Sequence, residues 1–374
     1  MILRRVLTLA VTCAAGLSVA SCGSDYPLGP AQEAAAENAS SSLSGTITGA
    51  GSSAQGPAMN AWQAEFATIH PDVRVQYSPD GSGAGRGALL AGAVDFAGSD
   101  ASVNEDELEE SRKVCGPDGA FNIPAYVAPI SIAFNLPGIE ELNLDAATIA
   151  GIFRGEVTRW DDPAITGQNG DIELPDLPIT PVSHSDDSGT TENFSDYLHA
   201  VVPDIWTDEA DGTFPSGLAG ENAKGNAGVV STVSGTEGAV TYADDSAVGP
   251  PLGKANLLVG DEYVAVSPEA AAAAVDVAEP VEGRAEFDIA LNLDRKTTAP
   301  GAYPLVLVSY HIYCSTYGDE ETANLVRTFG TFVVSEEGQQ AAAEAVGSAP
   351  ISASLSKRAA EAISTIGVES QAGA

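Results

Sequence analysis

Four short stretches of the sequence combine glycine with hydroxyl side chains in a way that suits anion binding. They are residues 50–54 (Ala-Gly-Ser-Ser-Ala), 81–83 (Gly-Ser-Gly), 98–100 (Gly-Ser-Asp) and 187–191 (Asp-Ser-Gly-Thr-Thr). At least three come directly before a predicted helix, and the first N–H groups of a helix are unpaired and carry a partial positive charge. Glycine lets the backbone approach a ligand, and serine or threonine adds a hydroxyl donor. Converging turns of this kind would form a neutral cage for a tetrahedral oxyanion.

Each stretch alone has an ordinary explanation, because Ser, Thr, Asp and Gly are the usual residues of N-caps and turns. Asp100 in particular could simply cap a segment that begins at Ala101. As a binding residue, it would discriminate between anions. Monobasic and dibasic phosphate keep a proton that a carboxylate accepts as a hydrogen bond, whereas sulfate at neutral pH would leave the carboxylate unpaired and desolvated. Asp100 therefore favours phosphate over sulfate.

The segments that must position these turns alternate between strand and helix. Strands are predicted over 45–51, 73–77 and 94–98, and helices over 56–69 and 86–93. This alternation favours a parallel sheet. The two strongest strand patterns lie later, at 128–135 and 303–313. Further predicted elements are a helix at 147–154, a strand at 179–183 and helices at 192–201, 322–335 and 339–346.

The N-terminus has the pattern of an export signal. Arg4 and Arg5 precede a short apolar stretch, which is typical of a signal peptide over residues 1–21. The stretch ends in Val19-Ala20-Ser21-Cys22, which resembles the bacterial lipobox, so Cys22 is the expected lipidation site; the alternative is an ordinary signal peptide with a chance cysteine. Residues 22–44 are too poor in large apolar residues to order themselves and are predicted to be a disordered tether. We expect an exported protein, lipid-anchored at the cell membrane and facing the periplasm or the exterior.

The composition narrows the classes of partner. Among 374 residues, 16 are basic and 52 acidic, which gives a net charge of −36. Such a field repels nucleic acid, so no nucleic-acid partner is expected. The acidic surface suits a solvated coat, as in a salty habitat, with cation binding as the alternative. No EF-hand loop is present and the four histidines are scattered, so we expect no metal site and no cofactor. Cys115 and Cys314 are a candidate disulfide, or else two buried thiols.

Taken together, the motifs resemble those of the substrate-binding protein of the bacterial high-affinity phosphate ABC importer. The resemblance covers residues 45–360. The shared motifs, in chain order, are Thr48-Gly-Ala-Gly-Ser-Ser53, Gly81-Ser-Gly-Ala-Gly85, Asp95-Phe-Ala-Gly-Ser-Asp100, Phe134-Asn-Leu-Pro-Gly138, Trp160-Asp-Asp-Pro-Ala-Ile165, Ser185-Asp-Asp-Ser-Gly-Thr-Thr191 and Gly225-Asn-Ala-Gly228. No single motif is specific, but the whole set in this order is.

The resemblance implies an α/β fold of the periplasmic-binding-protein type, with two lobes, two crossover strands and a ligand cleft between the lobes. Lobe 1 would comprise residues 45–128 and 303–374, and lobe 2 residues 129–302. The implied phosphate ligands are Ser52, Ser53, Ala54, Ser82, Asp100, His184, Ser188, Gly189 and Thr190. Two positions depart from the family. Ala54 stands where the family often has an aromatic residue, and His184 stands where it usually has an arginine, which is always charged and binds oxyanions with two donors.

The expected function is capture of inorganic phosphate by a monomer that closes around it and delivers it to the membrane permease, without catalysis. A binding protein for another oxyanion, such as sulfate or molybdate, is the main alternative. An added role in adhesion or phosphate sensing stays open. An exported aspartic protease is a weaker alternative, because Asp187-Ser-Gly resembles one half of that active site and no second copy exists.

Overall fold

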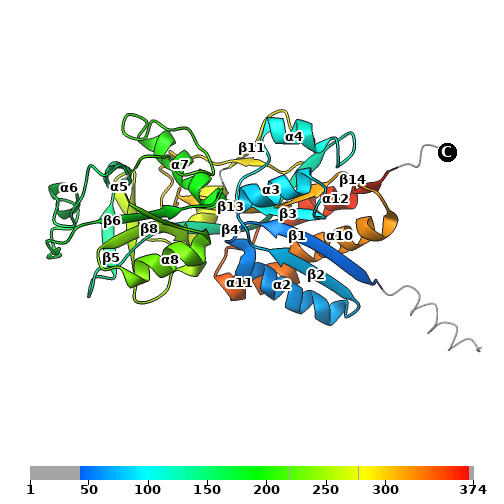
Figure 1. Ribbon diagram of the computed structural model, residues 1–374, viewed down its shortest axis with the longest axis horizontal. Helices are drawn as coiled ribbons and strands as arrows, with labels where there is room; N and C mark the ends of the chain where they lie inside the picture. The colour runs from blue at the N-terminus through cyan, green and yellow to red at the C-terminus, as the bar shows by residue number, and fades with distance from the viewer. Residues whose placement is uncertain (1–42, 219, 277, 370–374) are drawn as a thin grey trace, which may run out of the picture. The chain divides into compact units, whose positions relative to one another are not determined.

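The computed structural model describes residues 43–218, 220–276 and 278–369. The predicted signal peptide, Cys22 and almost all of the predicted tether lie outside these residues. Figure 1 shows two groups of helices and strands with the strands β4 and β13 running between them. We call the group that begins the described chain the first lobe and the other group the second lobe. The predicted α/β fold with two lobes is confirmed by the structure and by the related proteins reported below. The residue boundaries of the lobes stay a prediction.

The first lobe is built on three parallel strands, with β1 between β2 and β3. Its strands and helices are β1 (Gly45–Gly51), α2 (Gln55–Ile69), β2 (Val73–Ser78), α3 (Ser82–Leu90), β3 (Phe96–Ser99), α4 (Glu105–Ser111), β14 (Thr316–Tyr317), α10 (Glu320–Val333), α11 (Glu336–Val346), α12 (Ala353–Ser364) and β15 (Gly367–Val368). The apolar spacing of α2 places Met59, Trp62 and Phe66 in the core, as a period of 3.6 residues predicts. Phe66 and Phe96 both pack on Phe329 of α10.

The strands β4 (Ala120–Phe134) and β13 (Val306–Cys314) are antiparallel to each other and completely buried. Residues 120–129 of β4 pair with β13, and residues 130–134 pair with β8 of the second lobe. One strand therefore runs through both lobes. The prediction found only the second half of β4. Pro124 lacks an N–H group and lies where the pairing shifts between Ser309 and Tyr310, so the first half does not read as a regular strand.

The second lobe places β6 between β7 and β8, all three parallel. Its main elements are β5 (Glu141–Leu144), α5 (Ala146–Arg154), α6 (Pro163–Thr166), β6 (Thr180–His184), α7 (Gly189–Val201), β7 (Glu221–Ala223), α8 (Gly225–Gly235), β8 (Ala239–Asp244), the 3-10 helix η1 (Asp245–Ala247), β9 (Gly253–Val259), β10 (Glu262–Val264) and α9 (Pro268–Val275). The short strands β11 (Glu279–Pro280) and β12 (Leu291–Asn292) form a separate two-stranded sheet, and the segment between them bonds to Val103 and Asn122. The parallel pairing predicted for 45–98 is confirmed for β1, β2 and β3, and β6, β7 and β8 are parallel as well. The sheet as a whole is mixed, because β4 and β13 run antiparallel to their neighbours.

A disulfide joins Cys115, which follows α4, to Cys314 at the end of β13, with their Cα atoms 4.4 Å apart. The two cysteines are 199 residues apart in the sequence. The bond links two segments at the same edge of the first lobe, away from the turns that carry the candidate site. Within the described part of the chain, every helix is too short or too polar to cross a membrane.

Candidate functional site

The four Gly/Ser turns come together, and three of them start helices. The turn at 50–54 leads into α2, Ser82 is the first residue of α3, and Ser188 is the N-cap of α7. Backbone hydrogen bonds join the first three turns: Ser52 N donates to Gly98 O at 2.8 Å, and Gly81 N donates to Gly51 O at 2.9 Å. The turn at 98–100 differs from the other three. No helix begins at Ala101, because the next one, α4, starts at Glu105 with Asn104 as its cap. Asp100 is therefore not a helix cap.

Asp100 is the centre of the site and is 3% exposed. Its Oδ2 accepts from Ser52 Oγ at 2.6 Å and lies 3.5 Å from Ser82 Oγ. Its Oδ1 accepts from Ser309 Oγ at 2.6 Å. Burial raises the pKa of the Asp100 carboxyl above its ordinary value, although the hydrogen bonds from Ser309, Ser52 and Ser82 act in the opposite direction. The carboxylate is thus held in a dry and fixed position without a cation bonded to it.

The second lobe reaches this centre through the start of α7. Gly189 is so close that a Cβ atom placed on it would lie 2.6 Å from Ser82 Oγ and 2.7 Å from the Cβ of Asp100. Nearby, Gly83 N donates to Asp187 O at 3.2 Å, from the first lobe to the second. The helix N-termini of α3 and α7 therefore face the same small region around Asp100.

Ser53 and Thr190 lie together at another side of the site, one on each lobe. Asn226, the second residue of α8, is within hydrogen-bond distance of both hydroxyls. Ala54 is buried at the start of α2, and its N–H donates to Ser52 Oγ at 3.0 Å. The predicted ligands from the two lobes are therefore adjacent in space.

His184 ends β6 and is 2% exposed. Its ring stacks on Tyr242, and its Nδ1 lies 3.6 Å from Asp186 Oδ1. Neither ring nitrogen has a hydrogen-bond partner. Burial would raise the pKa of Asp186, but the contact with His184 and the hydrogen bond from Gly225 N bring it below its ordinary value. His184 is therefore a buried polar ring next to an ionised aspartate, with capacity left for a hydrogen bond.

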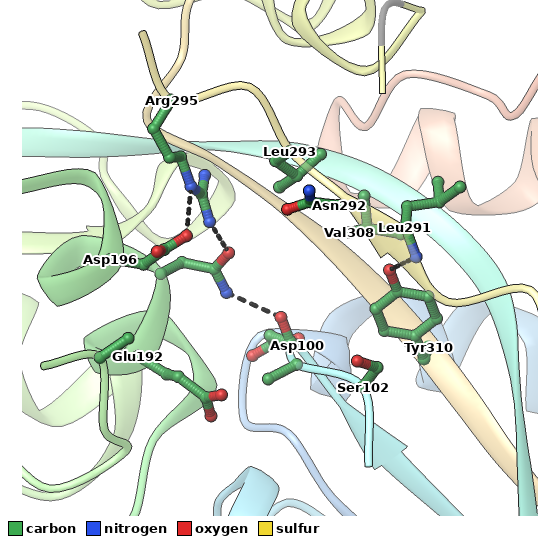
Figure 2. A pocket seen from close by; sticks show the side chains of 13 residues that line it. Asp100, Ser102, Glu192, Asp196, Leu291, Asn292, Leu293, Arg295, Val308 and Tyr310 are labelled. Atoms are coloured by element: carbon green, nitrogen blue, oxygen red, sulfur yellow. Dashed lines mark hydrogen bonds and ion pairs between the residues drawn. The ribbon is translucent and has the colours of Figure 1, made fainter. Parts of the chain in front are cut away.

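Two arginines approach the site, and both already have partners. Arg86 bonds Glu107 at 2.8 Å and Ser99 Oγ at 3.0 Å. Arg295 donates to Asp196 at 2.7 Å and also to Asn193, as Figure 2 shows. Arg295, Asp196 and Asp100 all line a cavity of about 220 Å³. The guanidinium groups of both arginines are already bonded to other side chains. Neither one therefore replaces the arginine that the family usually has at the position of His184.

Three residues of the site were not predicted: Ser309, Asn193 and Asn226. Asn193 of α7 donates to the backbone oxygen of Asp100 at 2.7 Å, which ties the second lobe to the first. Ser309 carries a detectable signal, because it is a hydroxyl residue inside the apolar run of β13. Asn226 was visible as part of a shared motif. Asn193 has no local signal, since its role depends only on how the two lobes meet.

Within residues 43–218, 220–276 and 278–369, no three His, Cys, Asp or Glu side chains come together as metal ligands would. The groups around Asp100 are hydroxyls, backbone N–H groups and one amide. Such a set can hold an oxyanion that keeps one proton, because one acceptor is surrounded by donors.

Comparison with known proteins agrees with this chemistry. Residues 36–337 match the PBP superfamily domain. The chain is 34% identical over 327 residues to the phosphate-binding protein PstS 3 of Mycobacterium tuberculosis, covering 85% of this chain and 87% of the relative. It is 36% identical over 290 residues to PstS 3 of Mycobacterium leprae, covering 76% and 77%.

Solved structures with the same fold are more distant in sequence. The periplasmic phosphate-binding protein PfluDING, solved with bound phosphate, matches with a TM-score of 0.67 at 21% identity, over 84% of this chain and 92% of that one. A phosphate-binding protein from Stenotrophomonas maltophilia matches with a TM-score of 0.62 at 20% identity, over 85% and 93%. At these identities the likeness supports the fold and no more.

Proposed function

Because the chain belongs to the PBP superfamily and, within it, to the phosphate-binding proteins named PstS, we propose that the site around Asp100 binds inorganic phosphate. The protein then serves as the substrate-binding component of a phosphate ABC importer. It captures phosphate between its lobes and passes it to the permease in the membrane.

One observation carries the proposal: a buried carboxylate lies where helix starts from both lobes converge. The N-termini of α3 and α7 supply backbone N–H groups and partial positive charge. Asp100 supplies a buried carboxylate to this cage, with both oxygens held by serine hydroxyls. A phosphate that keeps one proton pairs with both the donors and the acceptor. Its ionised oxygens accept hydrogen bonds from the N–H groups and hydroxyls, and its own hydroxyl donates to Asp100.

Four further properties belong to the same proposal. We propose that the protein is exported, that Cys22 carries a lipid anchor, that the molecule acts as a monomer and that it performs no catalysis. The absence of catalysis is supported by relatives that are named as binding proteins. The α/β lobes also differ from the β-sheet lobes of an aspartic protease, which weakens that alternative.

Calorimetry of the domain from residue 43 onward, with phosphate, sulfate and arsenate, tests the proposed ligand. We expect tight binding of phosphate, comparable binding of arsenate because it has the same charge and protonation, and no binding of sulfate. The titration should be run at low and high salt, because the net charge of −36 repels anions at low ionic strength. Failure to bind phosphate at either salt concentration would refute the function, and preference for sulfate or molybdate would move it to another oxyanion.

A second prediction concerns the missing arginine. His184→Arg should tighten phosphate binding at both pH 8 and pH 6, because arginine is charged at both pH values and can bind an oxyanion with two donors. Phosphate itself titrates in this range, so the ratio of mutant to parent affinity is the quantity to compare. His70→Arg, outside the site at the end of α2, controls for the added charge. A ratio of one at both pH values would remove His184 from the site.

A further inference from the structure

We infer that Asn226 orients two hydroxyl groups of the site, Ser53 on the first lobe and Thr190 on the second, so that both donate their hydrogens to the bound oxyanion. The inference rests on the proposed phosphate site and deepens it. Asn226 can contact both hydroxyls only when the two lobes are together, so its role belongs to the closed site.

The geometry around Asn226 is closed on all sides. The residue is 2% exposed. Its Oδ1 accepts from Asp244 N at 2.8 Å, and its Nδ2 lies 3.2 Å from Ser53 Oγ and 3.4 Å from Thr190 Oγ1. Its own backbone N–H donates to Ser53 Oγ at 3.3 Å. One side chain thus touches both lobes and is anchored by the end of β8.

The direction of the amide follows from its anchor. A backbone N–H can only donate, so the amide oxygen must face Asp244 and the NH₂ group must face Ser53 and Thr190. A flipped amide would place two donors against each other and bury an unsatisfied N–H. The preceding Gly225 supports this placement: its φ of 69° suits glycine, and its N–H donates to Asp186 Oδ1 at 2.7 Å.

The hydroxyls are oriented in turn. A serine hydroxyl has one hydrogen and two acceptor positions. Ser53 Oγ accepts from both the backbone N–H and the amide of Asn226, so only its hydrogen is left for a ligand. Thr190 Oγ1 accepts from the same amide and is biased in the same way. Ser82 differs, because its Oγ accepts from Asp100 N at 3.1 Å while its own hydroxyl donates to Asp100 Oδ2 at 3.5 Å.

The site is therefore divided into two sets of hydroxyls. The hydroxyls of Ser52 and Ser309 each donate a hydrogen bond to the Asp100 carboxylate at 2.6 Å. Ser53 and Thr190 have acceptor positions occupied by Asn226 and direct their hydrogens to the ligand. This division matches a phosphate that needs one acceptor and several donors. Asn226 is a positioning residue, since it acts on the ligand through the hydroxyls it orients.

A double-mutant cycle tests the role of Asn226. Phosphate affinity is measured by calorimetry for the parent, Ser53→Ala, Asn226→Ala and the double variant. In the parent, Ser53→Ala should weaken binding about tenfold, which corresponds to losing one hydrogen bond to a charged ligand. In the Asn226→Ala background the same change should cost only about twofold, because an unoriented hydroxyl contributes less. Thr190→Val should show the same coupling.

Asn226→Asp provides a stricter test of the same coupling, because aspartate keeps the shape of the asparagine side chain. Its carboxylate accepts where the amide donated, so it draws the hydrogen of Ser53 away from the ligand, and a further Ser53→Ala change should then cost nothing. Asn60→Ala, an exposed asparagine on α2, is the matched control and should bind as the parent does. Thermal unfolding without phosphate identifies any variant that has lost its fold.

The outcomes separate this inference from the proposed function. If the losses from Ser53→Ala and Asn226→Ala simply multiply, or if Asn226→Ala binds as the parent does, the orienting role is wrong while the phosphate site stands. If the parent itself binds no phosphate, the proposed function has failed.

Discussion

Replacing Gly189 by alanine is expected to weaken phosphate binding by at least about 100-fold, or roughly 2.7 kcal/mol. Gly189 begins α7, and a Cβ there would lie 2.6 Å from Ser82 Oγ, 2.7 Å from Asp100 Cβ and 3.0 Å from Asp100 N. All three atoms belong to the other lobe. The added methyl group therefore holds the lobes apart where the ligand needs donors from both, because the backbone of Asp100 cannot move aside.

The fold of each lobe should survive this change, since the conflict disappears when the lobes separate. Thermal unfolding without phosphate should shift little, whereas calorimetry should show the loss of affinity and X-ray scattering should show a more open molecule in saturating phosphate. Gly87→Ala is the matched control, because a Cβ at this position in α3 has nothing within 4 Å. Parent-like affinity in Gly189→Ala would mean that the closed contact seen here is not the binding form.

The turns of the site could be predicted from the sequence because their signals are local. Glycine and hydroxyl residues before a helix mark a turn whatever the rest of the chain does. Helix α2 begins one residue before the predicted position 56, and α7 begins at 189 instead of the predicted 192. The start of α3 was predicted four residues late. Its first residues include Gly83, Gly85 and Gly87, which disfavour a helix on their own. The contacts between Gly83 and Asp187 and between Gly81 and Gly51 support the helix start instead.

Helix α4 was missed although the sequence contains its signal. Asn104 and Glu107 form a capping box, with Glu107 N bonded to Asn104 Oδ1 at 2.9 Å and Asn104 N bonded to Glu107 Oε2 at 2.9 Å. The three acidic residues of the first turn, Glu105, Asp106 and Glu107, also suit the positive end of a helix. Apolar periodicity alone predicts no helix here, because α4 has only seven residues and little such periodicity.

The contacts that unite the lobes could not be predicted in this way. Asn193 reaches Asp100 across 93 positions in the sequence, and Asn226 reaches Ser53 across 173. Both are amides on ordinary amphipathic or polar helices, where a solvent-facing role is the usual expectation. Ser309 is 209 residues from Asp100 and meets it only because β13 lies beside β3. Long-range pairing decides these roles, and no local pattern encodes it.

The strong negative charge of the chain makes the choice of donor groups in the site informative. A net charge of −36 slows the approach of an anion. If electrostatic attraction alone determined binding, we would expect a cluster of lysines in the site. The cage uses hydroxyls and helix starts instead, and its arginine neighbours are already paired with Glu107 and Asp196. Affinity must then come from directed hydrogen bonds in a closed site, which depend little on salt, and selectivity must come from the one acceptor among them.

Asp100→Asn is accordingly expected to destroy the selectivity between phosphate and sulfate rather than the binding of phosphate. In the parent, sulfate would face a buried carboxylate with no proton to share, a penalty of several kcal/mol. An asparagine removes the charge and offers an N–H, so sulfate binding should rise at least about 100-fold. Phosphate can turn its own hydroxyl toward the amide oxygen, so its affinity should change by less than about tenfold.

The measurement is a pair of calorimetric titrations at pH 7, with phosphate and with sulfate, for the parent, Asp100→Asn and Asp118→Asn. Asp118 is exposed in the same lobe, so its replacement makes the same change in net charge without touching the site. The raised pKa of Asp100 adds a check, because protonation should bring the parent closer to the asparagine variant as the pH falls. Sulfate binding by the parent should therefore rise on acidification while that of Asp100→Asn stays level. A parallel pH response in the two proteins would show that Asp100 is not the group that rejects sulfate.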